Sequence, residues 1–225
     1  MLLPLLWASF ASLQTARAAT ITVATLTDKA DGVGACSLRE AIQNANDDAA
    51  TFANCTAGTG ADIIDFSVSG TITFTVGSSI FVTDADGLVI DGGGNIVLDG
   101  GGSPSGTRLF DVTGVLTLDN ITLQNGYNSG SGGAISTNFT SDLTIVNTRI
   151  VGNSSDNNGG ALLSGGALTV TDSVFENNSA GGDGGAIHHS SSSSMNITNV
   201  AFIGITARFL VPATSQPGIF SITKC

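Results

Sequence analysis

Two aspartates that open glycine-rich turns are the first candidates for chemistry in this sequence. Asp91 precedes three glycines, and Asp99, eight residues later, precedes three more. Clustered carboxylates, one with a raised pKa, form the acid–base set that hydrolyses a glycosidic bond. Aspartate is also a common first residue of tight turns. Turn initiation explains both positions, so we predict no catalytic role for either.

Basic residues that could abstract a proton are scarce. A calcium-dependent lyase needs acidic ligands beside such a base. Beyond residue 62 the basic residues are Arg108, Arg149, Arg208 and Lys224. Strand alternation points Arg149 outward, as a solvated or ion-paired side chain. We therefore predict no catalytic residues, and a polysaccharide lyase or hydrolase remains the alternative function.

The chain has one pair of histidines, His188 and His189. Adjacent residues of a strand point to opposite faces, so the two rings cannot close on one metal ion. We expect a surface position without function. No metal ligand and no cofactor is predicted, and calcium bound by oxygen ligands of the Asp-rich turns is the alternative.

The composition favours strands and tight turns over helices. Of 225 residues, 30 are Gly and only 11% are charged, and the net charge is −11. An acidic chain repels nucleic acid and anionic lipid, so nucleic acid is excluded as a partner. Extracellular glycans and surface proteins remain as candidate partners of a monomeric chain.

The N-terminus has the features of an export signal. An apolar stretch runs from Leu2 to Leu13 and is followed by Ala16, Arg17 and Ala18, a small-x-small pattern before a cleavage point. Residues 1–18 are therefore predicted to be a signal peptide of a secreted or cell-surface protein without a transmembrane segment in the mature chain. In an oxidising compartment Cys36 and Cys55 could pair, and both the bonded and the free form are open.

A repeated string predicts the architecture. Gly-Gly-Ala-Ile begins at Gly132 and Gly184, Gly-Gly-Ala-Leu begins at Gly159, and the copies recur after 27 and 25 residues. Such a period is typical of a solenoid whose units bury their apolar sides by stacking. At the same spacing the following inward columns align: Leu116, Leu143, Leu168 and Met195; Leu118, Ile145, Val170 and Ile197; Leu123, Ile150, Phe175 and Phe202.

A polar column accompanies the apolar ones. Its members are predicted to stack at a turn, where they hydrogen-bond along the stack and tolerate a left-handed backbone. They are Asn120, Asn147, Asp172 and Asn199.

The sequence contains one convincing helix. Ser37 and Glu40 form a capping box, and Leu38, Ala41 and Ile42 begin an apolar helical face. We expect this helix to cover the open end of the apolar column.

The domain organisation follows from these features. We predict a signal peptide (1–18), an N-terminal strand and capping helix region (19–62), a parallel β-helix (63–204) and an aberrant tail (205–225). The tail departs from the repeat pattern and represents either an unrelated cap or a frameshifted or truncated end.

Two resemblances agree with this architecture. The strings from Cys36 to Asn46, Gly60 to Phe66 and Val89 to Gly94 resemble bacterial exported proteins of the CSLREA type. That resemblance implies an all-β, right-handed parallel β-helix of the pectate-lyase-like class.

The later repeats resemble those of chlamydial polymorphic outer membrane proteins, which pair Gly-Gly-Ala-Ile with Phe-x-x-Asn. Phe175 and Asn178 match the second string in full. The resemblance implies a surface-exposed protein, often an adhesin. We therefore expect a structural or adhesive role at the cell surface. A gene fragment without a function of its own is a further alternative.

Overall fold

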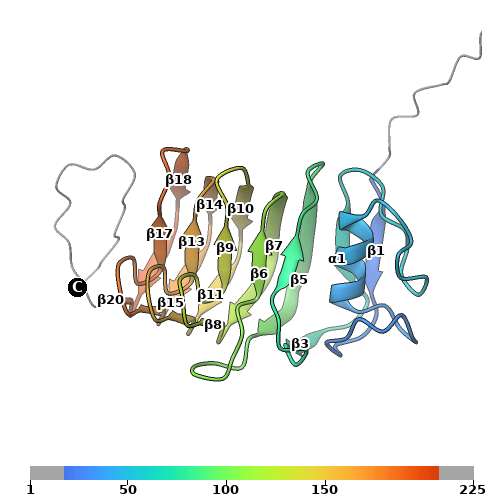
Figure 1. Cartoon of the computed structure of the whole chain (residues 1–225), viewed down its shortest axis with the longest axis horizontal. Coiled ribbons are helices and arrows are strands. Elements are labelled where there is room, and N and C mark those ends of the chain that lie inside the picture. Colours follow the sequence, from blue (N-terminus) through green and yellow to red (C-terminus); the bar gives the residue numbers. More distant parts are fainter. Residues whose placement is uncertain (1–17, 208–225) are drawn as a thin grey trace, which may run out of the picture.

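The computed structural model describes residues 18–207, which form a parallel β-solenoid with one short helix at its N-terminal end (Figure 1). The predicted all-β parallel β-helix is confirmed. Residues 1–17 of the predicted signal peptide and residues 208–225 of the predicted tail lie outside the described residues.

The largest sheet runs the length of the solenoid, and each strand on its main path pairs in parallel with a strand of the next coil. These strands are β1 (Thr20–Val23), β2 (Ile63–Phe66), β5 (Leu88–Asp99), β7 (Val115–Gln124), β10 (Asp142–Val146), β14 (Ala167–Thr171) and β18 (Met195–Thr198). The same sheet also includes β3 (Gly70–Thr73), β11 (Arg149–Val151), β15 (Val174–Glu176) and β19 (Ala201–Ile203).

Two smaller sheets complete the coils. One contains β4 (Ile80–Val82), β6 (Phe110–Val112), β9 (Ile135–Thr137), β13 (Leu162–Ser164) and β17 (Ile187–His189). The other contains β8 (Tyr127–Asn128), β12 (Ser154–Ser155), β16 (Ser179–Ala180) and β20 (Thr206–Ala207).

The predicted apolar columns form the core. Ile145 lies opposite Leu118 on one side and Val170 on the other, and all three side chains are fully buried. Phe175 stacks on Phe202 with 5.2 Å between the ring centroids. Each coil thus covers the apolar side chains of the coil before it, which is how a solenoid buries a core.

The predicted polar column lies at the corner between the two halves of each coil. Its four residues all have positive φ, between 48° and 52°. Asn and Asp tolerate this left-handed conformation better than other non-glycine residues. The corner turns the chain from β10 into β11 and from β14 into β15.

Parallel pairing in the described residues runs from β1 to β20. At one end, β1 pairs with β2, so the first strand belongs to the main sheet. At the other, Thr206 and Ala207 pair in register with Ser179 and Ala180. Parallel pairing needs only extended backbone and a matching register, so it continues where the sequence repeat is lost.

Candidate functional site

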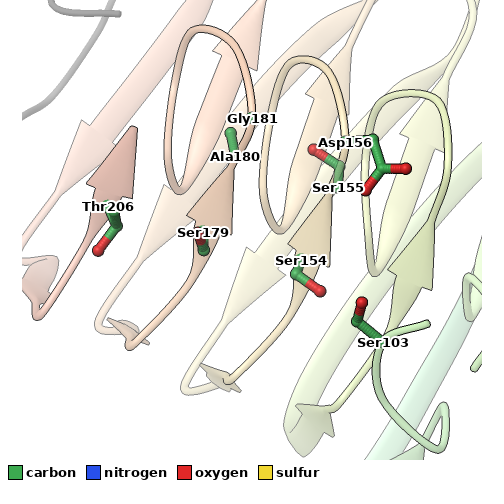
Figure 2. A pocket seen from close by; sticks show the side chains of 8 residues that line it. All are labelled: Ser103, Ser154, Ser155, Asp156, Ser179, Ala180, Gly181 and Thr206. Carbon is green, nitrogen blue, oxygen red and sulfur yellow. The ribbon is translucent and has the colours of Figure 1, made fainter. Parts of the chain in front are cut away.

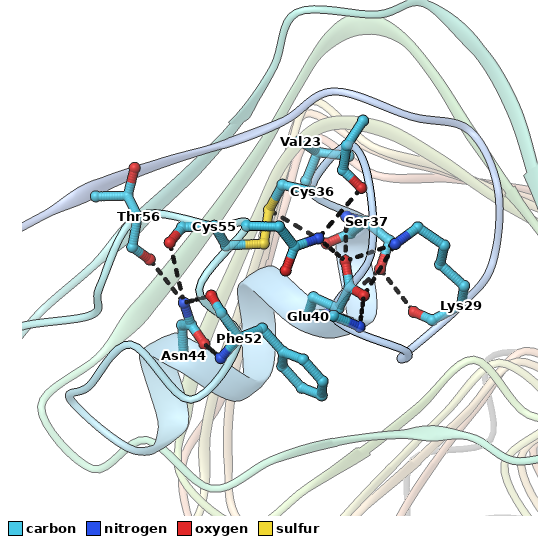
Figure 3. The surroundings of a disulfide bond; sticks show 12 residues. Val23, Lys29, Cys36, Ser37, Glu40, Asn44, Phe52, Cys55 and Thr56 are labelled. Atoms are coloured by element: carbon cyan, nitrogen blue, oxygen red, sulfur yellow. Dashed lines mark hydrogen bonds and ion pairs between the residues drawn. A yellow bond between two sulfur atoms is a disulfide. The ribbon is translucent and has the colours of Figure 1, made fainter.

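The helix α1 (Leu38–Asn46) and the loops around it form an N-terminal cap, residues 24–62, at one end of the solenoid (Figure 1). Figure 3 shows the hydrogen bonds and the disulfide within this cap. The helix begins with the capping box, in which Ser37 accepts from the Glu40 N–H and Glu40 accepts from the Ser37 N–H. Cys36 and Cys55 form a disulfide with 4.9 Å between their Cα atoms. The bond closes the loop that contains the helix.

Glu40 is a fully buried carboxylate at the centre of the cap. It accepts hydrogen bonds from the N–H groups of Ser37 and Gly32, from Asn54 Nδ2 at 2.9 Å and from Lys29 Nζ at 3.0 Å. Burial raises the pKa of Glu40, but these hydrogen bonds outweigh it and lower the pKa from 4.5 to about 2. The carboxylate therefore connects the start of the helix to the surrounding loops of the cap.

Arg39 connects the cap to the solenoid. Its guanidinium pairs with Asp28, donates to Ser78 O at 2.6 Å and lies 5.0 Å from the centroid of the Phe74 ring. A planar, fivefold donor suits this combination of an ion pair, carbonyl acceptors and an aromatic face. Cys36, Ser37, Arg39 and Glu40 thus each make a bond that holds the cap together.

The two candidate aspartates of glycine-rich turns form turn hydrogen bonds. Asp91 Oδ1 accepts from the Gly93 N–H at 2.9 Å, and Asp99 Oδ1 accepts from the Gly101 N–H at 2.8 Å. The other oxygen of Asp99 accepts from Gln124 Nε2 at 2.7 Å. These contacts agree with the expectation that the two residues initiate turns.

The described arginines beyond the cap are ion-paired. Arg149 Nη2 lies 2.7 Å from Glu176 Oε2, with 49% of its side chain exposed. Arg108 pairs with Asp111 and donates to Ser131 O at 2.5 Å. Among the described residues, no group of three or more His, Cys, Asp or Glu side chains is arranged to hold a metal ion.

The expected surface position of the two histidines is wrong. His188 is 8% exposed and His189 is 2% exposed. His189 points into the core, where Nδ1 lies 3.0 Å from Ser164 Oγ and Nε2 lies 3.0 Å from Ser193 O. Strand alternation requires one of two neighbours to face inward, and Ser164 provides the polar partner. Burial lowers the pKa of His188.

The corner column carries amide–carboxylate bonds along the solenoid. Asn147 Nδ2 donates to Asp119 Oδ1 at 3.1 Å, and Asn199 Nδ2 donates to Asp172 Oδ1 at 2.5 Å. Asn120 Nδ2 lies 3.4 Å from Asp91 Oδ1. These bonds tie one coil to the next at a corner where the backbone has positive φ.

An internal pair of asparagines, Asn153 and Asn178, was not predicted. Both side chains are fully buried. Asn178 Oδ1 accepts from both the N–H and the Nδ2 of Asn153, and Asn178 Nδ2 donates to Ile150 O at 2.9 Å. Asn153 Oδ1 in turn accepts from the Gly126 N–H at 2.7 Å. The sequence contains a sign of this pair, because the Asn of the Phe-x-x-Asn string, Asn178, follows Asn153 by 25 residues, which is one repeat.

Among the described residues, a candidate binding site is a groove beside the sheet of β8, β12, β16 and β20, with a volume of about 460 Å³ (Figure 2). Its lining includes the hydroxyl side chains of Ser154, Ser179 and Thr206, which lie directly opposite one another on successive coils. Ser103 lines the end of the groove nearest the N-terminal half. None of these residues was singled out from the sequence.

A carboxylate and an aromatic ring accompany these hydroxyls. Asp156 also lines the groove and accepts a hydrogen bond from the Tyr127 hydroxyl at 3.0 Å. Tyr127 occupies the same row as Ser154, one coil earlier. The hydrogen bond to Asp156 raises the pKa of Tyr127. Hydroxyl groups and a carboxylate thus line the groove, and Tyr127 contacts that carboxylate.

Comparison with known proteins identifies one repeat. Residues 172–190 match the model of the Chlamydia polymorphic membrane protein repeat. The matched segment contains β15, β16 and β17, with Asn178 and the Gly-Gly-Ala-Ile copy that begins at Gly184. Comparison with curated proteins and with solved structures found no match.

The repeat match and the parallel solenoid together point to a surface or outer-membrane type of β-helix protein. Within the described range, no helix is both long enough and apolar enough to cross a membrane. The resemblance of Cys36–Asn46 to exported CSLREA-type proteins stays a prediction.

Proposed function

We propose that this chain is an exported, cell-surface β-helix protein with an adhesive role, which binds extracellular glycans or surface proteins along its polar flanks. The main support is the register of the outward-facing side chains. On the largest sheet Thr117, Thr144, Thr169 and Asn196 lie directly opposite one another on four successive coils.

Such a row presents hydrogen-bonding groups at a regular interval. Neighbouring strands lie about 4.8 Å apart, so each coil repeats the same polar group at that spacing. An extended face of this kind is how solenoid proteins make binding surfaces. The repeat in residues 172–190, which is like that of a membrane protein of Chlamydia, supports placement at a cell surface.

Binding of the mature chain to an array of neutral and acidic glycans and immobilised surface proteins tests this function. We expect retention on at least one class of array member, and loss of that retention when the chain is unfolded by heat. A natively folded chain that binds no member of the array, and does not adhere to cells, would contradict the adhesive role.

A further inference from the structure

We propose that the groove lined by Ser154, Ser179, Thr206 and Asp156 binds an extended, neutral, β-1,4-linked glycan whose chain lies along the solenoid axis. This inference rests on the adhesive function proposed above and assigns its ligand and its site. The argument uses the spacing, the charge and the side-chain chemistry of the groove.

The spacing of the groove suits a linear polymer. Ser154, Ser179 and Thr206 occupy equivalent positions on three successive coils. Three coils span two strand spacings, or about 10 Å. An extended β-1,4-linked glycan advances by a similar distance per sugar as the solenoid does per coil, so successive sugars meet successive hydroxyls. A volume of about 460 Å³ lies within the range of small-ligand sites.

The side chains match the hydroxyl groups of a sugar. Each serine or threonine hydroxyl can donate one hydrogen bond and accept two, as a sugar hydroxyl can. The Asp156 carboxylate accepts from neighbouring hydroxyls of one ring, and a charged acceptor makes the stronger bond. The Tyr127 hydroxyl holds Asp156 in position at 3.0 Å, which reduces the ordering cost of binding.

The charge of the groove selects against acidic polymers. Asp156 lines it, no basic side chain does, and the whole chain carries a net charge of −11. A uronate or sialylated chain would bring carboxylates against this negative field at short range. A neutral glycan can form hydrogen bonds through its hydroxyl groups and carries no charge that the negative field of the groove would repel.

Titration with cellotetraose, followed by calorimetry and by backbone amide shifts, tests the assignment. We expect the amides of β12 and β16 to shift, and tetragalacturonate to bind at least about tenfold more weakly. Asp156→Ala should weaken cellotetraose binding by about tenfold or more, because it removes the charged acceptor. Tyr127→Phe should weaken it by a smaller factor, because the carboxylate remains but is no longer held.

Thr22→Val is the matched control. It removes an exposed hydroxyl from β1, which lies outside the groove, and should leave cellotetraose binding unchanged. Cellotetraose binding that Asp156→Ala does not weaken, or shifts confined to the row of Thr144, would overturn the groove assignment.

The outcomes separate this inference from the proposed function. A chain that adheres to array members but does not bind cellotetraose retains the adhesive function and loses the groove assignment. Retention on immobilised surface proteins, without retention on any glycan, likewise retains the adhesive function and removes the groove assignment. A folded chain that binds nothing removes both.

Discussion

Glu40 is a buried carboxylate whose hydrogen bonds come from the loops and the lysine of the cap. Its pKa of about 2 lies below the ordinary value of 4.5, so the ionised form is favoured by folding. A carboxyl group with a depressed folded-state pKa stabilises the protein above its unfolded pKa and loses that contribution as the pH falls. The relevant window is therefore from about pH 4.5 down to about pH 2.

Glu40→Gln should lower the free energy of unfolding by about 2–3 kcal/mol at pH 7, because the neutral amide loses the charge that Lys29 and the N–H groups stabilise. Urea unfolding at pH 7 and at pH 2.5 measures the effect, and the difference from the unsubstituted chain should shrink at the lower pH. Glu176→Gln, which removes a half-exposed ion pair, is the control and should change little. A difference that is equal at both pH values would contradict the assigned role.

Asn178 carries the second prediction at this scale. Asn178→Ala removes the acceptor of two Asn153 donors and the donor to Ile150 O. It leaves the buried Asn153 N–H without its acceptor, whereas Asn153 Nδ2 keeps its hydrogen bond to Leu123 O. The expected loss is about 2–4 kcal/mol of unfolding free energy. The exposed Asn157→Ala is the control, with an expected change below about 0.5 kcal/mol. Equal stability of the two variants would show that the internal ladder contributes nothing.

At the scale of elements, the cap is a short helix held by covalent and polar links. A nine-residue helix is marginal by itself, so its stability depends on packing and on these links. The Arg39 contacts fasten one side of the helix to the loop before β4, and Asn46 Nδ2 donates to Phe81 O at 2.9 Å from the other end. The Cys36–Cys55 disulfide closes the loop between these two residues, which contains the helix.

Removing the disulfide should therefore destabilise the cap. Cys36→Ser with Cys55→Ser is expected to cost about 3 kcal/mol, because the bond restricts a loop with a sequence separation of 19 residues. Thermal unfolding with and without a reducing agent, in a Cys225→Ser background, is the measurement. The reducing agent should lower the melting temperature of the bonded chain and leave the double variant unchanged. A bonded chain that is insensitive to reduction would contradict the prediction.

At the scale of the whole molecule, the two ends of the described solenoid differ. The N-terminal end is covered by α1, whose Leu38, Ala41 and Ile42 are buried. In the last described coil Met195, Ile197 and Phe202 are only partly buried. In a solenoid, stability is the sum of coil stabilities and contacts between neighbours.

Hydrogen exchange should reveal this difference. Among the described residues, β18 and β19 each pair with one strand, whereas β7 and β10 pair on both sides. We therefore expect amides of β18 and β19 to exchange faster than those of β7 and β10. The strand β1, beneath the cap, serves as the internal control and should be protected more strongly than β18. Uniform protection along the solenoid, or slower exchange in β18 than in β10, would contradict this account.

The sequence alone determined the solenoid, its inward columns, its left-handed corners and the capping box. These features are periodic or local: alternation, the repeat spacing and the N-cap pattern depend on residues within one coil or one turn. The pairing of β1 and β20 could not be predicted in this way, since both strands pair through their backbone and carry no repeat string.

The tertiary structure decided which side chains contact one another between coils. Only the stacked coils bring Asn178 onto Asn153, Ser164 onto His189 and Tyr127 onto Asp156. The groove lies over strands of two residues, too short to show any alternation in the sequence. Contacts between coils join residues about one repeat apart, and their geometry depends on register and side-chain direction, which a linear sequence does not specify.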